Sequence, residues 1–435
     1  MNMNVDNKRP RGFTSQVLRV VQVLIVLVVA LVSARPEAAA DGTADKLGEL
    51  FFPYRQGTPK AAGVTPGLKI DSTNAHLLQE VLPPELLDHV AAGEFSFILQ
   101  DTTDTPLRQE YIDATIQHSG KAALGSEKLQ NYVAGLPFPL LDLHDPQAGI
   151  KGAWNYRYRD RGDSVQYWPT NEHRTGTGAV ERSETFYIAQ MFGPHSAGGA
   201  AAGDRQAWER RGIYAKRYMR FVAPSDAEGR QVMSLTYEND LQLDDQWLYD
   251  PRTRRTRKVV YNPYEAPGNG QLLSEDTSGF NGYLHVYDWT YVGEKVVLAP
   301  SPIRSAEPTL GGRGNWYPTD PWELRKAIVL EAKSRDSHPL YSRRLLYLDA
   351  QTYANLYTFA YDLEGKHRRT FLQVYFHPQF NPWNNKVWLP QISAQLSLDY
   401  ERDRASIFQT HKVVYNEHLN ENRWFSIMAL MLNGK

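Results

Sequence analysis

From about residue 164 onward, the chain is a succession of short segments rich in aromatic and β-branched residues, each followed by a turn. This pattern is typical of an antiparallel sheet or barrel, in which consecutive strands pair with one another. Long helical patterns do not alternate with the segments, which argues against a parallel α/β fold. The total of 25 Tyr, 16 Phe and 10 Trp also favours β structure. The expected strands are 185–191, 213–222, 231–237, 246–249, 257–261, 282–297, 327–332, 343–348, 356–361, 371–376 and 391–400.

The region before these strands, residues 41–160, has the pattern of short helices and loops. Asp145 and Pro146 place a good N-cap residue before a proline at the first helical position, so a helix is expected to run toward Asn155. We expect residues 41–160 to pack on the sheet formed by 161–435 and to belong to the same domain. Further helices are expected over 77–82, 85–92 and 107–118.

The first forty residues have the pattern of an export signal. Three cations, Lys8, Arg9 and Arg11, precede an apolar run over 20–32, and Ala38–Ala40 supply small residues for cleavage. The run is shorter than the roughly 20 residues that a membrane-spanning helix needs. We therefore expect cleavage near Ala40 and a protein of the bacterial periplasm, with an uncleaved anchor as the alternative.

Composition excludes several classes of site. The sequence contains no cysteine, which excludes disulfides, thiolate metal sites, cysteine nucleophiles and the acylated cysteine of a lipoprotein. The net charge of −1 gives no support to nucleic-acid binding, which favours a strongly basic surface. After Asp41 no apolar stretch is long enough to cross a bilayer, so the exported chain is expected to be soluble and not anchored in a membrane.

Residues 246–258 predict a β-hairpin with one aromatic and one basic strand. Asp250 suits the first position of a type I turn, and Pro251 presets φ at the second. An aromatic sheet face with a basic rim suits an apolar ligand with an anionic head, or docking onto an acidic partner; an ordinary hairpin with a solvated turn is the alternative. The candidates for headgroup or partner binding are Arg252, Arg254, Arg255, Arg257 and Lys258.

Residues 282–292 form the strongest strand pattern. Because side chains alternate along a strand, Leu284, Val286 and Val292 would share one face. The opposite face would carry Tyr283, His285, Tyr287, Trp289 and Tyr291. A strand with two partly apolar faces fits one face packed on a helix and the other lining a cavity; burial under helices and loops is the alternative.

Other predicted strands are aromatic as well. A sheet with aromatic residues on both faces must have both faces covered by other segments, or it must curve into a concave container. Aromatic residues are therefore candidates for the wall of a ligand cavity, although a single β-bulge would move any of them to the other face. The candidate wall residues are Trp247, Tyr249, Tyr283, Tyr287, Trp289, Tyr347 and Phe359.

Catalytic motifs are missing from the sequence. It contains no Gly-x-Ser-x-Gly elbow, no His-Glu-x-x-His zinc pair and no phosphate-binding Gly-x-x-x-x-Gly-Lys motif. The histidines are scattered without metal-ligand spacing, and acidic pairs such as Asp244-Asp245 cannot be told from surface acids. We expect no catalytic residue, no metal ligand, no cofactor and no enzymatic activity.

Several stretches together resemble the exported bacterial family catalogued as domain of unknown function 1329, which is similar to periplasmic lipoprotein-sorting proteins of the LolA/LolB type. The Gly-Leu-Pro-Phe-Pro segment at 135–139 is the most specific of them, and the resemblance covers nearly all of the exported chain. The matching stretches are Asn131–Pro139, Asp145-Pro146, Ala153–Asn155, Trp247–Pro251, Arg254–Arg257, Gly279-Phe280, Tyr287–Trp289, Trp322–Leu324, Arg344–Asp349 and Tyr361-Asp362.

The resemblance implies a mostly β (α+β) fold: a curved, incompletely closed antiparallel sheet, or half-barrel, with helices plugging or lidding its concave face. Proteins of this kind bind acyl chains on the concave side. The resemblance also implies a carrier or adaptor for a lipidic molecule, working beside a membrane exporter of the resistance-nodulation-division type. The sorting receptor is itself lipid-anchored, whereas this chain has no cysteine for such an anchor.

The expected function is therefore reversible binding of a lipid or another long hydrophobic molecule inside the curved sheet. Burying a dozen methylenes at ~0.8 kcal/mol each contributes about 10 kcal/mol before ordering costs are subtracted. Two alternatives stay open. A structural adaptor between an inner-membrane exporter and an outer-membrane component would have a filled interior and an exposed apolar patch. A periplasmic hydrolase would need a polar cleft with two carboxylates or a Ser-His pair.

Overall fold

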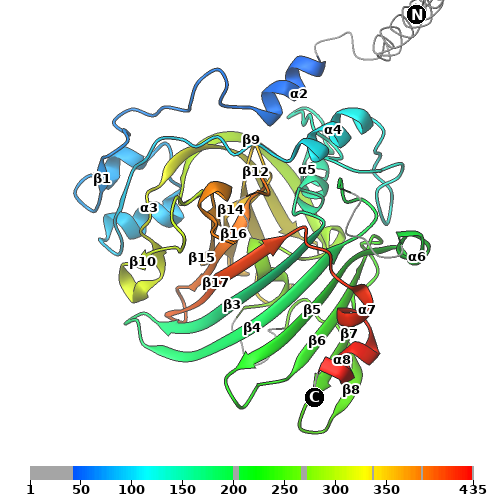
Figure 1. Cartoon of the computed structure of the whole chain (residues 1–435). Coiled ribbons are helices and arrows are strands. Elements are labelled where there is room, and N and C mark those ends of the chain that lie inside the picture. The colour runs from blue at the N-terminus through cyan, green and yellow to red at the C-terminus, as the bar shows by residue number, and fades with distance from the viewer. Residues whose placement is uncertain (1–42, 199–204, 266–271, 336–337, 384–385, 434–435) are drawn as a thin grey trace, which may run out of the picture. The chain divides into compact units, whose positions relative to one another are not determined.

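A large antiparallel sheet dominates the computed structural model, which describes residues 43–198, 205–265, 272–335, 338–383 and 386–433 (Figure 1). The expected signal peptide lies outside these residues. The chain divides into Met1–Lys46 and Leu47–Lys435, and the second unit contains every described strand. Whether 41–160 and 161–435 form one domain, as expected, stays a prediction.

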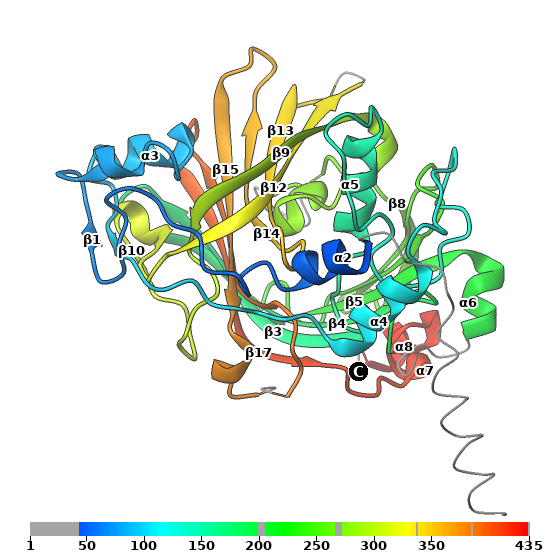
Figure 2. The same cartoon turned by 90° about the horizontal axis from the view of Figure 1, so that it is seen from above.

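The sheet has thirteen strands in the order β8-β7-β6-β5-β4-β3-β17-β16-β15-β14-β13-β12-β9. The edge strands β8 and β9 do not pair with each other, so the curved sheet stays open, as expected from the sequence (Figure 2). The strands are β3 Ser164–Thr175, β4 Val180–Phe192, β5 Ile213–Ala223, β6 Gln231–Tyr237, β7 Asp245–Asp250, β8 Arg255–Val260, β9 Tyr287–Ala299, β12 Glu323–Ser334, β13 Arg343–Asp349, β14 Asn355–Tyr361, β15 His367–Phe376, β16 Gln391–Asp399 and β17 Arg404–Tyr415.

Short helices and two small strand pairs accompany the sheet. The strand pairs are β1 Lys69–Ile70 with β2 Phe97–Ile98, and β10 Leu310–Gly311 with β11 Tyr317–Pro318. The α-helices are α2 Thr43–Phe51, α3 Pro84–Ala91, α4 Gln109–His118, α5 Ala148–Arg157, α6 Arg205–Arg211, α7 Glu421–Trp424 and α8 Ile427–Asn433. The 3₁₀ helices are η1 Ala75–Leu78, η2 Ser274–Gly279, η3 Leu284–Val286, η4 Arg313–Asn315 and η5 Pro378–Phe380.

Helix α5 plugs the concave side of the sheet by packing against β9 and β12. Two glycines allow this close approach: a Cβ atom at Gly149 would lie 2.2 Å from the backbone oxygen of Trp289, and one at Gly152 would lie 2.8 Å from the Leu330 side chain. Segment η2 packs against β14, β15 and β16 beside it. We call the sheet face that carries α5 and η2 the inner face, and the opposite one the outer face.

Strands β3 and β17 were not expected from the sequence, although they lie side by side in the middle of the sheet. Strand β3 contains Pro169 and charged residues, which are depleted in central strands. Pro169 is tolerated because it pairs with Thr410 where the register of β17 shifts at a bulge. The polar His173 of β3 is satisfied by Ser406 of β17, 3.1 Å away.

The expected strand 282–297 begins five residues later than predicted. Residues Leu284–Val286 form the turn η3 because the carboxylate of Asp240 accepts the backbone N–H groups of Leu284 at 3.1 Å and His285 at 2.6 Å. The register of the β9–β12 pair also shifts next to Val292. The predicted face of five residues, Tyr283 to Tyr291, is therefore interrupted: η3 separates Tyr283 and His285 from the strand, and the register shift follows directly after Tyr291.

A buried ion network fills the inner face beneath η2. Arg344 donates hydrogen bonds to Glu275 and, at 2.7 Å, to Asp276, and Tyr287 donates one to Glu275 at 2.9 Å. Burial opposes ionisation of Glu275, but the Arg344 guanidinium holds the pKa of Glu275 below its usual value. The network continues through Arg369, which bonds Asp399 at 2.6 Å. The interior of the half-barrel is thus occupied by the chain's own charged and aromatic side chains.

Replacing Arg344 with methionine should destabilise the protein strongly, by about 3–5 kcal/mol, because Glu275 and Asp276 lose their shared cation inside the protein. Arg335→Met is the matched control: Arg335 pairs with Asp288 at 2.7 Å on the surface, and its loss should cost less than about 1 kcal/mol. Urea unfolding followed by tryptophan fluorescence measures both. Equal losses of unfolding free energy would contradict the structural role of the network.

Candidate functional site

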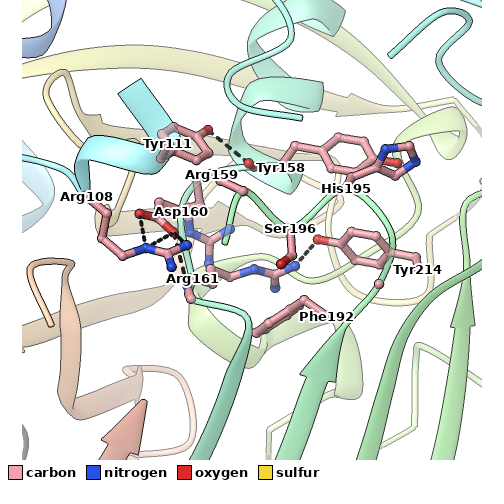
Figure 3. Close-up of a pocket in the computed structure, with 13 residues that line it drawn as sticks. Arg108, Tyr111, Tyr158, Arg159, Asp160, Arg161, Phe192, His195, Ser196 and Tyr214 are labelled. Atoms are coloured by element: carbon pink, nitrogen blue, oxygen red, sulfur yellow. Dashed lines mark hydrogen bonds and ion pairs between the residues drawn. The ribbon is translucent and has the colours of Figure 1, made fainter. Parts of the chain in front are cut away.

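A small pocket lies where the segment linking α5 to β3, residues 158–163, meets α4 and the ends of β4 and β5 (Figure 3). Its cavity of about 40 Å³ has room for roughly three water molecules. The residues that line it are Arg108, Tyr111, Tyr158, Arg159, Asp160, Arg161, Gly162, Phe192, Gly193, His195, Ser196, Ala197 and Tyr214.

Two cations at this pocket, Arg159 and Arg161, lack a carboxylate partner among the residues the structure describes, and Arg159 is occupied by the Tyr156 carbonyl oxygen and ring. Arg161 is the candidate for binding an anion. Its guanidinium contacts the Tyr214 hydroxyl and the Arg157 carbonyl oxygen, and it lies 4.4 Å from the centre of the Phe192 ring. Burial, together with the positive charges of Arg159 and Arg157, lowers the pKa of Arg161 to about 9. A cation that is desolvated without a counter-charge favours the arrival of an anion.

The neighbouring Arg108, in contrast, is fully compensated. It donates hydrogen bonds to Asp160 at 2.6 and 2.9 Å and lies 3.4 Å from Asp163. Burial alone would lower the pKa of Arg108, but the two carboxylates raise it above its ordinary value. Arg108 is therefore a structural cation that ties the start of α4 to the segment 158–163.

Aromatic rings surround the polar groups. The ring of Tyr158 lies 4.4 Å from Tyr132, 5.3 Å from Tyr214 and 5.6 Å from His195 between ring centres. The Tyr111 hydroxyl donates a hydrogen bond to the Tyr158 carbonyl oxygen at 3.0 Å. Such a low-dielectric environment strengthens the attraction between Arg161 and an anion.

The serine and histidine of the pocket do not form a nucleophile–base pair. Ser196 donates its hydroxyl proton to Asp163 at 2.7 Å. The two ring nitrogens of His195 contact the Val133 carbonyl oxygen at 2.8 Å and Glu238 at 3.1 Å. Because neither nitrogen faces Ser196, this geometry suits binding rather than acyl transfer.

A second, apolar pocket of about 30 Å³ lies close to the first. Burial raises the pKa of Tyr375, which lines the second pocket, and the positive charge of Arg159 in the first pocket offsets part of this effect. The segment directly before α4, residues 105–108, reaches both pockets, and we call it the strap. Thr105 and Pro106 line the second pocket, and Arg108 lines the first. Other apolar residues of the second pocket are Pro302, Leu356, Phe376, Pro378, Leu389 and Pro390.

Comparison with known protein families gives one match. Residues 69–427 match the family described as protein of unknown function (DUF1329). The chain belongs to this family. Its family resemblance, deduced above from short motifs, is therefore confirmed.

Solved structures similar to this DUF1329 protein have low sequence identity. A DUF1329 family protein from Desulfovibrio piger is 16% identical, with a TM-score of 0.46 over 66% of this chain and 99% of that one. A LolA superfamily protein from Nitrosomonas europaea is 11% identical, with a TM-score of 0.37 over 62% of this chain and 94% of that one. A search of curated proteins finds no match.

The seven aromatic residues expected to form one wall in this DUF1329 protein are divided among three places. Tyr287 and Trp289 face inward, since Trp289 pairs with Ala332 and Ala332 with Arg344 of the inner network. Tyr283 precedes the strand and donates a hydrogen bond to Asp244 at 3.1 Å. The structure thus places these residues on different faces of the sheet, because the two-residue period fixes relative faces within one strand only.

The remaining four wall candidates lie on the outer face. Phe359 pairs with Leu345 and therefore faces away from Arg344 and Ala360. Tyr347 lies on the same face, 5.7 Å from Phe359 between ring centres and close to Glu85 of α3. Trp247 and Tyr249 belong to a separate apolar cluster with Trp208, Phe425 and Leu430, beneath α6, α7 and α8. Whether any of the seven touches a ligand stays a prediction.

The predicted basic hairpin is present as β7–β8, with the Asp250 carboxylate accepting the Arg252 N–H at 2.8 Å. Its five cations are exposed and do not line the pocket that contains Arg161. Sequence reasoning missed Arg161, although the alternation of Arg157, Arg159 and Arg161 directly after a predicted helix was a visible signal.

The described part of the chain contains no group of three or more His, Cys, Asp or Glu residues placed to hold a metal ion. Within the same residues, no helix is long and apolar enough to cross a membrane.

Arg161→Met should change the free energy of unfolding by less than about 1 kcal/mol, because the removed cation has no counter-charge to leave behind. Arg108→Met should cost about 3–5 kcal/mol, since it leaves Asp160 and Asp163 uncompensated. Urea unfolding of the two variants tests the contrast. A loss from Arg161→Met as large as that from Arg108→Met would assign Arg161 a structural role instead.

Proposed function

We propose that this protein binds an amphipathic molecule with one anionic group and a hydrophobic body, and carries it in the periplasm. The observation that supports the proposal most directly is Arg161, a desolvated guanidinium without a carboxylate partner at an aromatic pocket. The anionic group, a carboxylate or a phosphate, lies against Arg161. The export pattern at 1–40 supports the location.

The hydrophobic body lies toward the second pocket. Thr105 and Pro106, which line that pocket, belong to the same strap as Arg108 of the first. Each pocket holds only a small group, so a long chain reaches from one to the other by displacing side chains of this strap. This arrangement differs from a hollow half-barrel, because α5, η2 and the ion network fill the inner face.

The filled inner face also supports a second candidate, a structural adaptor that carries nothing. Such an adaptor would bridge a membrane exporter, of the resistance-nodulation-division type implied by the family resemblance, and an outer-membrane component. The hydrogen bonds of Ser196 and His195 speak against the hydrolase alternative at this pocket. The adaptor and the carrier differ in one measurable respect, the presence of a bound small molecule.

The first experiment is native mass spectrometry of the chain purified from periplasm, followed by organic extraction and lipid analysis. We expect a stoichiometric anionic amphiphile. A mass without ligand, together with no binding of added fatty acids or phospholipids, would reject the carrier in favour of the adaptor.

A matched pair of ligands tests the headgroup site. Decanoate and decanol share their hydrocarbon chain, so the protein should bind decanoate about 10- to 100-fold more tightly, the range of a charge-assisted hydrogen bond. Arg161→Met should abolish this preference while leaving the affinity for decanol unchanged. Arg335→Met, an exposed cation elsewhere, is the control. Equal affinities of the unaltered protein for the two ligands would contradict the proposal.

A further inference from the structure

Helix α8 exposes an apolar ridge. Its residues Met428 and Leu432 are 60% and 59% exposed, and Ile427 and Met431 are exposed as well. The opposite side of the same short helix is buried through Leu430. On folded proteins, exposed clusters of large apolar side chains often mark interaction surfaces.

The ridge is held in place and is not a frayed segment. Leu430 packs into the outer-face cluster with Tyr249 and Phe425, and its carbonyl oxygen accepts a hydrogen bond from Gln231 at 3.0 Å. Asn420 caps the preceding helix α7 by accepting the N–H of Arg423 at 3.2 Å. These contacts fix which side chains of α8 point outward.

Unpaired cations lie beside this ridge. Helix α8 packs against β8, the basic strand of the hairpin, and Figure 1 shows it next to the hairpin tip. The exposed residues Arg252, Arg254, Arg255 and Arg257 form ion pairs with no described residue. Arg252 and Arg254 lie in the turn at the tip, whereas Arg255 and Arg257 pair with Asp250 and Leu248 and so point to the sheet face opposite Tyr249 and α8. Lys258 differs, because it pairs with Asp245 at 2.6 Å.

Nearby acids do not neutralise these four arginines. Glu421 of α7 pairs with Lys216, and Asp226 pairs with Arg182 at 3.3 Å. The Asp250 carboxylate binds the backbone N–H of Arg252 and not a guanidinium. The surface made by α8 and the tip of the hairpin thus combines exposed apolar side chains with the two turn arginines, Arg252 and Arg254.

We propose that α8 and the tip of the β7–β8 hairpin together dock on an anionic lipid bilayer. The exposed side chains of α8 enter the boundary between headgroups and acyl chains, and the two arginines of the turn, Arg252 and Arg254, contact lipid phosphates. The ridge projects from the outer face, on the other side of the sheet from α5, and a bilayer accepts a projecting ridge without a shaped groove. The inference goes beyond the proposed function, because docking needs no bound ligand.

Sedimentation with lipid vesicles tests the surface, using the chain purified from periplasm. Binding should be at least about 10-fold tighter to vesicles with about 30 mol% phosphatidylglycerol than to pure phosphatidylcholine, and should weaken in high salt. Two variants should each lose about 10-fold or more of this binding: Arg252→Ser combined with Arg254→Ser, and Met428→Ser combined with Leu432→Ser.

Matched controls change the same number of exposed residues elsewhere on the described chain. One control changes two exposed cations to Ser, namely Lys295 and Lys366. The other combines Leu363→Ser with Ile116→Ser, both more than half exposed. Both controls should bind vesicles like the unaltered chain.

The proposal would be overturned by equal affinity for anionic and neutral vesicles, by an effect of the arginines without any effect of α8, or by equal losses in the test and control variants. Capture of an acidic protein without vesicle binding would assign the surface to a protein partner and reject the bilayer. Circular dichroism and thermal unfolding of each variant separate lost docking from lost folding. Arg161 is unaltered in all of these variants. A negative result in the vesicle experiment would therefore not contradict the proposed binding of an amphipathic molecule, which the decanoate experiment tests separately.

Discussion

The open sheet must be covered on both faces, and the rest of the structure depends on how this is done. Its edge strands β8 and β9 do not meet, so no barrel interior closes by backbone pairing. Helix α5 covers the inner face at a distance that Gly149 and Gly152 allow. Helices α3, α7 and α8 cover parts of the outer face.

Charge compensation separates structural from candidate functional groups. Arg344 and Arg108 are buried with carboxylates at hydrogen-bond distance, so they hold segments of the fold together. Arg161 is desolvated without such a partner, and the arginines of the hairpin tip are exposed without one. The first arrangement favours a small anion inside the protein, whereas the second favours an extended anionic surface outside it.

The local sequence pattern predicted strands correctly where aromatic and β-branched residues recur, as in β6 and β14. It failed for β3 and β17, whose polar residues are satisfied by each other, as His173 is by Ser406. The start of β9 was misplaced because Asp240, distant in sequence, holds the N–H groups of Leu284 and His285. The predicted hairpin and its exposed cations were found as expected, since a turn is specified by residues adjacent in the chain.

The sequence by itself determined the family, the antiparallel class of the fold and the turn at Asp250-Pro251, because these depend on local propensity and on short motifs. Only the tertiary structure decided which face each strand presents. Tyr287 points inward and Tyr347 outward because pairing register and bulges, not alternation within a strand, assign the faces. It also decided which arginines are neutralised, since Asp160 reaches Arg108 from 52 residues away and no described carboxylate reaches Arg161.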